Sequence, residues 1–409
     1  MKLFRYLIFL FIISLFAGCG ASKKFSENNN NETYVEDNSS IIRVLLDEKQ
    51  DSFTYIAEEP VILKDELRTL IIISDGDKIQ FKAEGNKVKS VAADKEYSGK
   101  FFQIISDDKR TVNLNDKNYK GSLRIVSKNN KIQIINTVAI EEYLKGVVPS
   151  EMPVGKGTDN YEALRAFSIC ARTYAFKKLN SLNNFDIYND VRDQVYGGEG
   201  SERTLSNKAI RDSRGLILTY DNEPAITFYH STCGGFTEDA SNVFSIKNAP
   251  YLQSIKDGDE PLCSISPKFA WTEFYSADEF IQRLRAAGLI TGFAWKLDTI
   301  NVVSRFKSGR VNELRITLKD DENQLKTVKI YGNNIRNIIR TSDNKSILNS
   351  TLFDIRKGEN DNVTIIGRGY GHGVGLCQFG AINLSRMGKD FVYILSHYYP
   401  GTKIKRYYD

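Results

Sequence analysis

Short apolar runs separated by polar residues dominate the chain between Ile41 and Ala139. The strongest of them are "IIRVLL", "VILKDE", "LIIIS", "KIQFKAE", "GSLRIVS" and "KIQIINTVAI". β-Branched residues in short runs between Asp, Asn, Lys and Gly are typical of strands, and no long helical period interrupts them. The pattern predicts a β-rich N-terminal region over residues 41–135, built of small antiparallel sheets or a partial barrel.

The pattern changes to a helical period further along the chain. In "TDNYEALRAFSICARTYAFKKLN", apolar side chains recur at helical spacing at Leu164, Phe167, Ala171 and Tyr174. Helical patterns return at "ADEFIQRLRAAGL" and "QFGAINLSRMG", with strand patterns at "NELRITL", "KTVKIYG" and "NVTIIG". This mixture predicts an α+β fold whose main core is formed by residues 136–409.

The first forty residues have a different character. Basic residues precede an apolar run from Leu7 to Phe16, which is shorter than the roughly twenty residues of a membrane span. The "AGCG" that follows resembles a bacterial lipobox, so we expect a lipoprotein signal peptide over residues 1–19 and lipidation of Cys19. An ordinary signal peptide with an incidental cysteine is the alternative. Residues 20–40 are polar and Asn-rich, which predicts a disordered tether.

These segments predict an exported lipoprotein, anchored to a membrane and facing the cell wall or periplasm. The amino-acid composition agrees with this prediction and adds little to it. Hydrophobic residues make up 41% and charged residues 26% of the 409 residues, as in globular proteins. The net charge of +5 is too weak and too dispersed to indicate nucleic-acid binding, although a mild positive bias suits an anionic polymer.

One acid stands out because two prolines flank it. In "VVPSEMP", Pro149 and Pro153 lie two residues to either side of Glu151. Each proline fixes its own φ and disfavours the helical conformation of the residue before it. The sequence therefore predicts a stiff, non-helical segment that holds the Glu151 carboxylate in place.

Three stretches together resemble the SpoIID/LytB family of bacterial cell-wall proteins. They are "NTVAIEEYLKGVVPSEMP" followed by "EALRAFSICARTYA", then "FYHSTCGGFTED", and finally "GRGYGHGVGLCQFGA". The family includes sporulation lytic transglycosylases and enhancers of cell-wall amidases. The resemblance implies a SpoIID-like fold, in which mixed antiparallel sheets and a few helices form a substrate cleft. It also implies peptidoglycan glycan strands as the ligand and a cell-wall amidase as a second partner.

In the enzymes of this family the Glu of the matching "SEMP" motif is the catalytic acid, which implies that role for Glu151. A lytic transglycosylase cleaves the bond between N-acetylmuramic acid and N-acetylglucosamine without water and leaves a 1,6-anhydro ring. One carboxyl group can act first as the acid and then as the base. We expect peptide-stripped strands as the substrate and no required cofactor. A non-catalytic peptidoglycan-binding protein that enhances an amidase is the alternative.

The resemblance supplies five candidate substrate-binding residues. Arg165 and Arg172 lie seven residues apart on one helix, where they could bind the lactyl carboxylate of muramic acid through paired hydrogen bonds. Gln194 in "DQVYGG", and His372 and Gln378 in "GHGVGLCQ", are the other three. For His372, a ring hydrogen-bonded to the backbone of a tight glycine turn is the alternative.

The cysteines raise the question of a metal. Some members of the family bind zinc through a Cys/His cluster near "NDVRDQVYGG", where this chain has neither residue type. A different set, His230, Cys233, Cys263 and Cys377, has the residue types and the number of a tetrahedral structural zinc site. A Cys233–Cys263 disulfide is the competing interpretation, because it fits an oxidising compartment. Unpaired thiols are a third.

Overall fold

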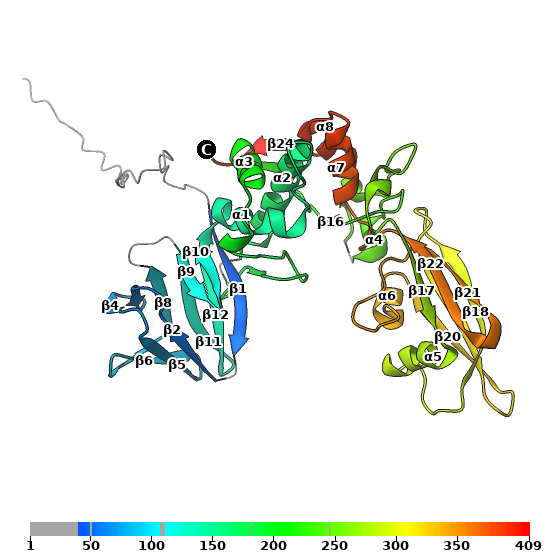
Figure 1. The fold of residues 1–409 in the computed structure, drawn as a ribbon, viewed down its shortest axis with the longest axis horizontal. Coiled ribbons are helices and arrows are strands. Elements are labelled where there is room, and N and C mark those ends of the chain that lie inside the picture. The colour runs from blue at the N-terminus through cyan, green and yellow to red at the C-terminus, as the bar shows by residue number, and fades with distance from the viewer. Residues whose placement is uncertain (1–39, 50, 107–110, 181, 245) are drawn as a thin grey trace, which may run out of the picture. The chain divides into compact units, whose positions relative to one another are not determined.

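The computed structural model describes residues 40–409 apart from 50, 107–110, 181 and 245 (Figure 1). The expected signal peptide, the lipidation of Cys19 and nearly all of the expected tether lie outside the described residues. Of the helices in this described part, none combines the length and the apolar character that a membrane span requires.

Two sheets and a hairpin build the N-terminal region. The larger sheet contains, in spatial order, β13 (Ile187–Tyr188), β1 (Ile41–Lys49), β12 (Lys131–Ala139), β11 (Ser122–Lys128), β8 (Phe101–Ser106), β3 (Val61–Lys64) and β4 (Thr69–Ile73). The smaller sheet contains β2 (Ser52–Ile56), β5 (Lys78–Glu84), β6 (Lys87–Ala92) and β7 (Lys95–Gly99). The hairpin joins β9 (Thr111–Leu114) to β10 (Lys117–Lys120).

Alternation of buried and exposed positions explains how these sheets pack. In β5, Ile79, Phe81 and Ala83 are buried, and the residues between them are exposed. A strand with this period of two presents one face to a core and the other to solvent. Strands β2, β5 and β6 contact β8, β11 and β12, so the buried faces of the two sheets meet. The prediction of a β-rich N-terminal region is confirmed.

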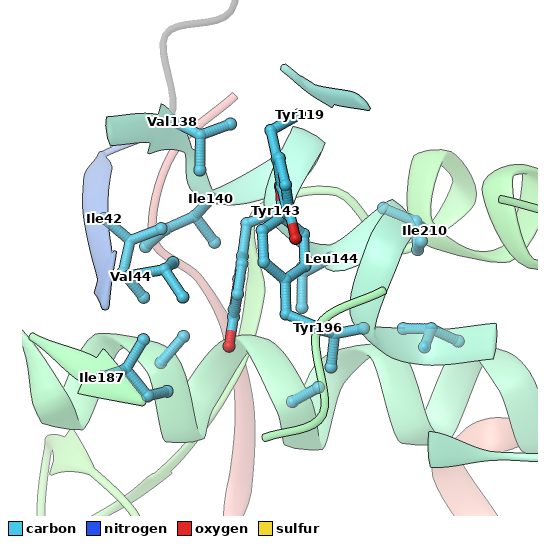
Figure 2. Close-up of a cluster of buried hydrophobic side chains, with 14 of the residues drawn as sticks. Ile42, Val44, Tyr119, Val138, Ile140, Tyr143, Leu144, Ile187, Tyr196 and Ile210 are labelled. Carbon is cyan, nitrogen blue, oxygen red and sulfur yellow. The ribbon is translucent and has the colours of Figure 1, made fainter. Parts of the chain in front are cut away.

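Helices continue the same core beyond the sheets. They are α1 (Ile140–Glu151), α2 (Tyr161–Lys178), α3 (Thr204–Asp212), α4 (Ala240–Val243), α7 (Gln378–Arg386) and α8 (Phe391–Tyr398). Helix α2 contacts α1, α3, α7 and α8, and this central position explains the apolar period that predicted it. Figure 2 shows Ile42 and Val44 of β1 beside Ile140 and Tyr143 of α1. The N-terminal sheets therefore share one core with the helices.

Short strand pairings bring distant parts of the chain together. Strand β16 (Tyr229–His230) pairs in parallel with β23 (Leu376–Cys377), and β14 (Leu216–Tyr220) pairs with β15 (Glu223–Pro224) and β24 (Lys403–Arg406). The glycine run before β23 permits its pairing. A Cβ atom on Gly375, at φ +72°, would lie 2.0 Å from the carbonyl oxygen of Phe228. Only glycine fits so close to the neighbouring backbone.

A second hydrophobic core lies between Tyr275 and Ile365. Its elements are the sheet β18 (Lys296–Arg305), β19 (Val311–Lys319) and β20 (Leu325–Tyr331), the sheet β17 (Ala270–Tyr275), β22 (Val363–Arg368) and β21 (Phe353–Lys357), and helices α5 (Ala277–Ala286) and α6 (Asn334–Ile339). Residues 136–409 thus contribute to two cores, which the sequence pattern did not reveal. The mixture of sheets and helices confirms the α+β prediction.

Candidate active site

Glu151 is the last residue of α1, and Pro149 lies inside that helix. The expectation of a non-helical segment is therefore wrong. A proline in the last turn removes only one of the helical hydrogen bonds, so the helix tolerates it there. The residue after Glu151, Met152, caps the helix with an extended backbone (φ −126°, ψ 132°), which is the conformation favoured before Pro153. The second proline thus fixes the helix end, and with it the position of the acid.

Two hydrogen bonds hold Glu151, one at its side chain and one at its backbone. Its Oε1 accepts the backbone N–H of Val195 at 2.5 Å, and its backbone oxygen accepts Nε2 of Gln378 at 2.9 Å. Val195 belongs to "DQVYGG", and Gln378 is the first residue of α7, so three motifs far apart in the sequence meet at this acid. The side chain of Glu151 remains partly exposed, which leaves it within reach of a ligand.

A packed group of polar aromatic side chains supports this arrangement. Gln194 accepts the hydroxyl of Tyr143 and donates to the hydroxyl of Tyr229, each at 3.2 Å. The ring of Tyr143 packs on that of Tyr196, with centroids 4.9 Å apart, as Figure 2 shows. Gln194 is fully buried. The prediction that it binds substrate is contradicted, because its amide is buried and bonded to these two tyrosines.

The environment of Glu151 favours its neutral form. Burial raises the pKa of its carboxyl group, and the hydrogen bond from Val195 offsets only part of this rise. The position at the C-terminal end of α1 acts in the same direction, since the carbonyl dipoles there disfavour a negative charge. A raised pKa keeps a larger fraction of the group protonated near neutral pH, as a general acid requires.

The two arginines predicted to bind substrate have different surroundings. Arg172 is 0% exposed, and its Nε and Nη2 lie 2.6 and 2.9 Å from the two carboxylate oxygens of Glu141. A guanidinium group paired in this way inside the core cannot reach a ligand, so the prediction is contradicted for Arg172. Arg165 is partly exposed, with Nη1 3.1 Å from Glu162 and its guanidinium 4.0 Å from the ring centroid of Phe391. Its binding role stays a prediction.

His372 and Gln378 both make backbone contacts. The Nδ1 atom of His372 accepts the N–H of Val374 at 3.0 Å, so Nε2 carries the proton and donates to the oxygen of Tyr229 at 2.9 Å. Burial lowers the pKa of His372 to about 3, which keeps the ring neutral. These contacts match the alternative of a ring bound within the glycine turn. The side chain of Gln378 donates to the backbone oxygen of Glu151 and so helps to position the acid.

The cysteines predicted to bind zinc do come together, but with a different fourth residue. The sulfurs of Cys233, Cys263 and Cys377 and a carboxylate oxygen of Asp257 all lie within 4.8 Å of one another, and all four residues are buried. His230 is contradicted as a member of this set, because its ring does not lie within the group of converging ligand atoms; its Nδ1 bonds to the oxygen of Val374 at 3.1 Å, and its Nε2 has no hydrogen-bond partner. Asp257 was missed, since it carries no motif of its own.

Close packing around Gly146 gives a test of how the site is held. A Cβ atom on Gly146 would lie 2.5 Å from Cε2 of Tyr196, the ring beside the segment that contacts Glu151. Gly146→Ala should therefore destabilise the fold by about 1–3 kcal/mol through overpacking. Urea unfolding measures the change. Gly200→Ala is the matched control, because a Cβ there meets no atom within 4 Å. Equal midpoints for both variants would contradict this packing.

Comparison with known families places two matches on the chain. A family model described as SpoIID, stage II sporulation protein, matches residues 128–220. This range contains Glu151 and the segment around Val195. A domain of unknown function, DUF8618, matches residues 263–375, a range that closely follows the second core.

Curated relatives extend the likeness over most of the chain. Stage II sporulation protein D of Bacillus subtilis is 31% identical over 289 residues, which are 66% of this chain and 76% of that protein. An uncharacterised protein of Brachyspira hyodysenteriae is 30% identical over 392 residues, covering 92% of this chain and 96% of its own length. The amidase enhancer of Bacillus subtilis is 28% identical over 304 residues, and only 40% of its length is covered.

Proposed function

This chain belongs to the SpoIID family of stage II sporulation proteins, and we propose that it is a peptidoglycan lytic transglycosylase with Glu151 as its acid and base. Family membership supports a role at the cell wall. The observation that carries the finer proposal is the arrangement of Glu151: one hydrogen bond holds its carboxyl group, a second holds its backbone, and the partly exposed carboxyl group has a raised pKa.

The hydrogen bond from Val195 fits a group that must work in both protonation states. Because Oε1 accepts this N–H, the transferable proton belongs on Oε2. That proton passes to the glycosidic oxygen while the bond to the muramic acid C1 breaks. The carboxylate then takes the proton of the C6 hydroxyl while the C6 oxygen bonds to C1 and closes the anhydro ring. This step restores the protonated acid. Burial favours the neutral state before the first step, and the N–H stabilises the carboxylate after it.

A neighbouring acid is committed elsewhere, which favours a mechanism with one carboxyl group. Asp193 receives the hydroxyl of Tyr174 at 2.8 Å, the backbone N–H of Tyr188 at 2.9 Å and Nζ of Lys178 at 2.6 Å. Hydrolysing glycosidases use a second carboxylate to activate water or to attack the sugar. Three donors leave Asp193 poorly suited to either task, and a transglycosylase needs neither.

Product analysis tests this proposal. The full chain would be incubated with intact peptidoglycan and with glycan strands freed of their peptides by an amidase. We expect mass spectrometry to detect 1,6-anhydro ends, lighter by one water than hydrolysis products, from the peptide-free strands. Reducing ends in their place would contradict the mechanism. Binding without cleavage of either substrate would favour an enhancer of a cell-wall amidase, the role named for one relative.

The cellular location forms part of the same proposal. A protein that acts on peptidoglycan must be exported, and the expected lipid on Cys19 would hold it at a membrane facing the wall. The partners are then glycan strands, the membrane through this anchor and, in the second candidate function, an amidase.

The raised pKa of Glu151 also predicts how its replacement changes stability with pH. The folded chain holds this proton more tightly than the unfolded chain, so ionisation above the ordinary pKa of about 4.3 weakens the folded state. The penalty grows as the pH rises through the folded pKa and then stays constant. Glutamine avoids it and still accepts the N–H of Val195.

Glu151→Gln should therefore be more stable than the wild type at about pH 8, and equally stable at about pH 4. Urea unfolding at both pH values measures the difference. A variant less stable than the wild type at both would show that the carboxylate is not penalised in the folded state.

A further inference from the structure

Four potential metal-ligand atoms, none of them from Glu151, come together in the protein interior. Three are the sulfurs of Cys233, Cys263 and Cys377, and the fourth is a carboxylate oxygen of Asp257. Around a zinc ion, sulfur ligands at about 2.3 Å in tetrahedral directions lie roughly 3.8 Å from each other. The sulfurs of Cys233 and Cys263 are 3.4 Å apart, and all four atoms lie within 4.8 Å of one another. The cluster therefore has the size of a tetrahedral zinc site.

The surrounding backbone points N–H groups at the sulfurs. Cys377 Sγ accepts the N–H of Cys233 at 3.2 Å, Cys263 Sγ that of Gly234 at 3.3 Å, and Cys233 Sγ that of Gly235 at 3.4 Å. Thiolates, rather than neutral thiols, are the form that donors stabilise and that metals bind. The "HSTCGG" turn thus supplies both a ligand and the donors that orient ligands.

Hydrogen bonds also fix the position of the Asp257 carboxylate. Its Oδ1 accepts the hydroxyl of Tyr398 at 2.7 Å, and its Oδ2 accepts the N–H of Cys263 at 3.0 Å. Outer hydrogen bonds of this kind hold the ligands of metal sites in place. The four ligand residues thus come from a turn, a loop, a 3-10 helix and the end of a strand, and α8 supplies the outer partner Tyr398.

Charge gives a further indication. Arg310 is 1% exposed, and one of its nitrogens, Nη2, donates to the oxygen of Cys233 at 2.8 Å. Its Nε and Nη1 have no hydrogen-bond partner. Three thiolates and a carboxylate around a divalent ion carry a net negative charge. A buried guanidinium beside them offsets part of it.

We propose that Cys233, Asp257, Cys263 and Cys377 bind one zinc ion as a structural site. Soft thiolate ligands select zinc over magnesium or calcium. The site would tie the "HSTCGG" turn and the short 3-10 helix η3 (Leu262–Ile265) to the start of α7. Cys377 directly precedes Gln378, which positions Glu151, so the ion would stabilise the backbone on which the candidate acid depends. The proposal does not require the transglycosylase activity.

Metal analysis of the wild type is the first test. The full chain, purified without chelators, should contain one zinc per molecule by elemental analysis. Its cluster thiols should react with a thiol reagent only after a chelator removes the ion. A chain that contains no zinc and takes up none overturns the proposal. A mass two hydrogens below that of the reduced chain would then indicate a disulfide, and an unchanged mass would indicate free thiols.

Variants then locate the ion. Asp257→Asn and Cys377→Ala should each lower the affinity for zinc at least about tenfold, since the loss of even an outer-shell partner typically costs about 10–100-fold. Cys170→Ala is the matched control, since Cys170 is also a buried cysteine but lies in α2 outside the cluster. It should keep one zinc. An unchanged affinity for zinc in both ligand variants would place the ion elsewhere and overturn the assignment.

Discussion

Glu151→Gln is expected to lower the rate of anhydro-product formation by about 10²–10⁴-fold, the contribution that a positioned general acid typically makes. Glutamine has nearly the shape of glutamate, and its amide oxygen can still accept the N–H of Val195. It cannot donate an acidic proton to the glycosidic oxygen or take one from the C6 hydroxyl. Both steps of the proposed reaction therefore lose their catalyst while the site keeps its form.

Glu142→Gln provides the matched control in the same helix. The Glu142 carboxylate lies 2.6 Å from Nζ of Lys145 and 2.7 Å from Nζ of Lys120, so it has a structural role. This variant should form product at close to the wild-type rate. Mass spectrometry of the product and circular dichroism of each variant separate chemistry from folding. Unchanged product formation in Glu151→Gln would remove Glu151 from the mechanism.

Arg172→Met is expected to destabilise the protein by about 3–5 kcal/mol, because it leaves a buried carboxylate without its cation. Glu141 is 3% exposed and would keep the hydroxyl of Tyr408 as a donor, but it would lose two charge-assisted hydrogen bonds. This loss arises from the protein interior and not from a substrate. The midpoint of urea unfolding would measure it.

Arg165→Met is the comparison that isolates the effect of burial. Arg165 lies on the same helix and also pairs with a glutamate, but both side chains are partly exposed to water. Exposed pairs of this kind contribute about 0.2–1 kcal/mol. If both variants lost the same stability, the buried pair would have no special importance. The double variant Glu141→Met with Arg172→Met should lose less than Arg172→Met alone, since no unpaired charge remains.

Local periodicity predicted much of the fold. The alternating run "KIQFKAE" became β5, and the 3.6-residue period around Phe167 became α2. Both signals depend on neighbours within a few residues, so the sequence contains them directly. The second core was not apparent, because its strands show the same short-range pattern as those of the first.

The site was harder to predict because its contacts are distant in sequence. Glu151 was found through a motif, but the N–H that holds it comes from Val195, 44 residues later. Arg165 and Arg172 do share a helical face, yet they differ in depth. The carboxylate that pairs with the buried Arg172 belongs to Glu141, which lies 31 residues earlier in α1. Asp257 could be recognised only once folding had brought three cysteines around it.

The pairing of β24 with β14 has a consequence for the order of events during folding. Residues 403–406 complete the sheet that begins at Leu216, and Tyr408 donates to the buried carboxylate beside Arg172. The interior around α2 therefore cannot close until these two distant parts of the chain have met. Pairings so far apart in sequence form slowly, because the entropy of loop closure is lost before the contacts compensate for it.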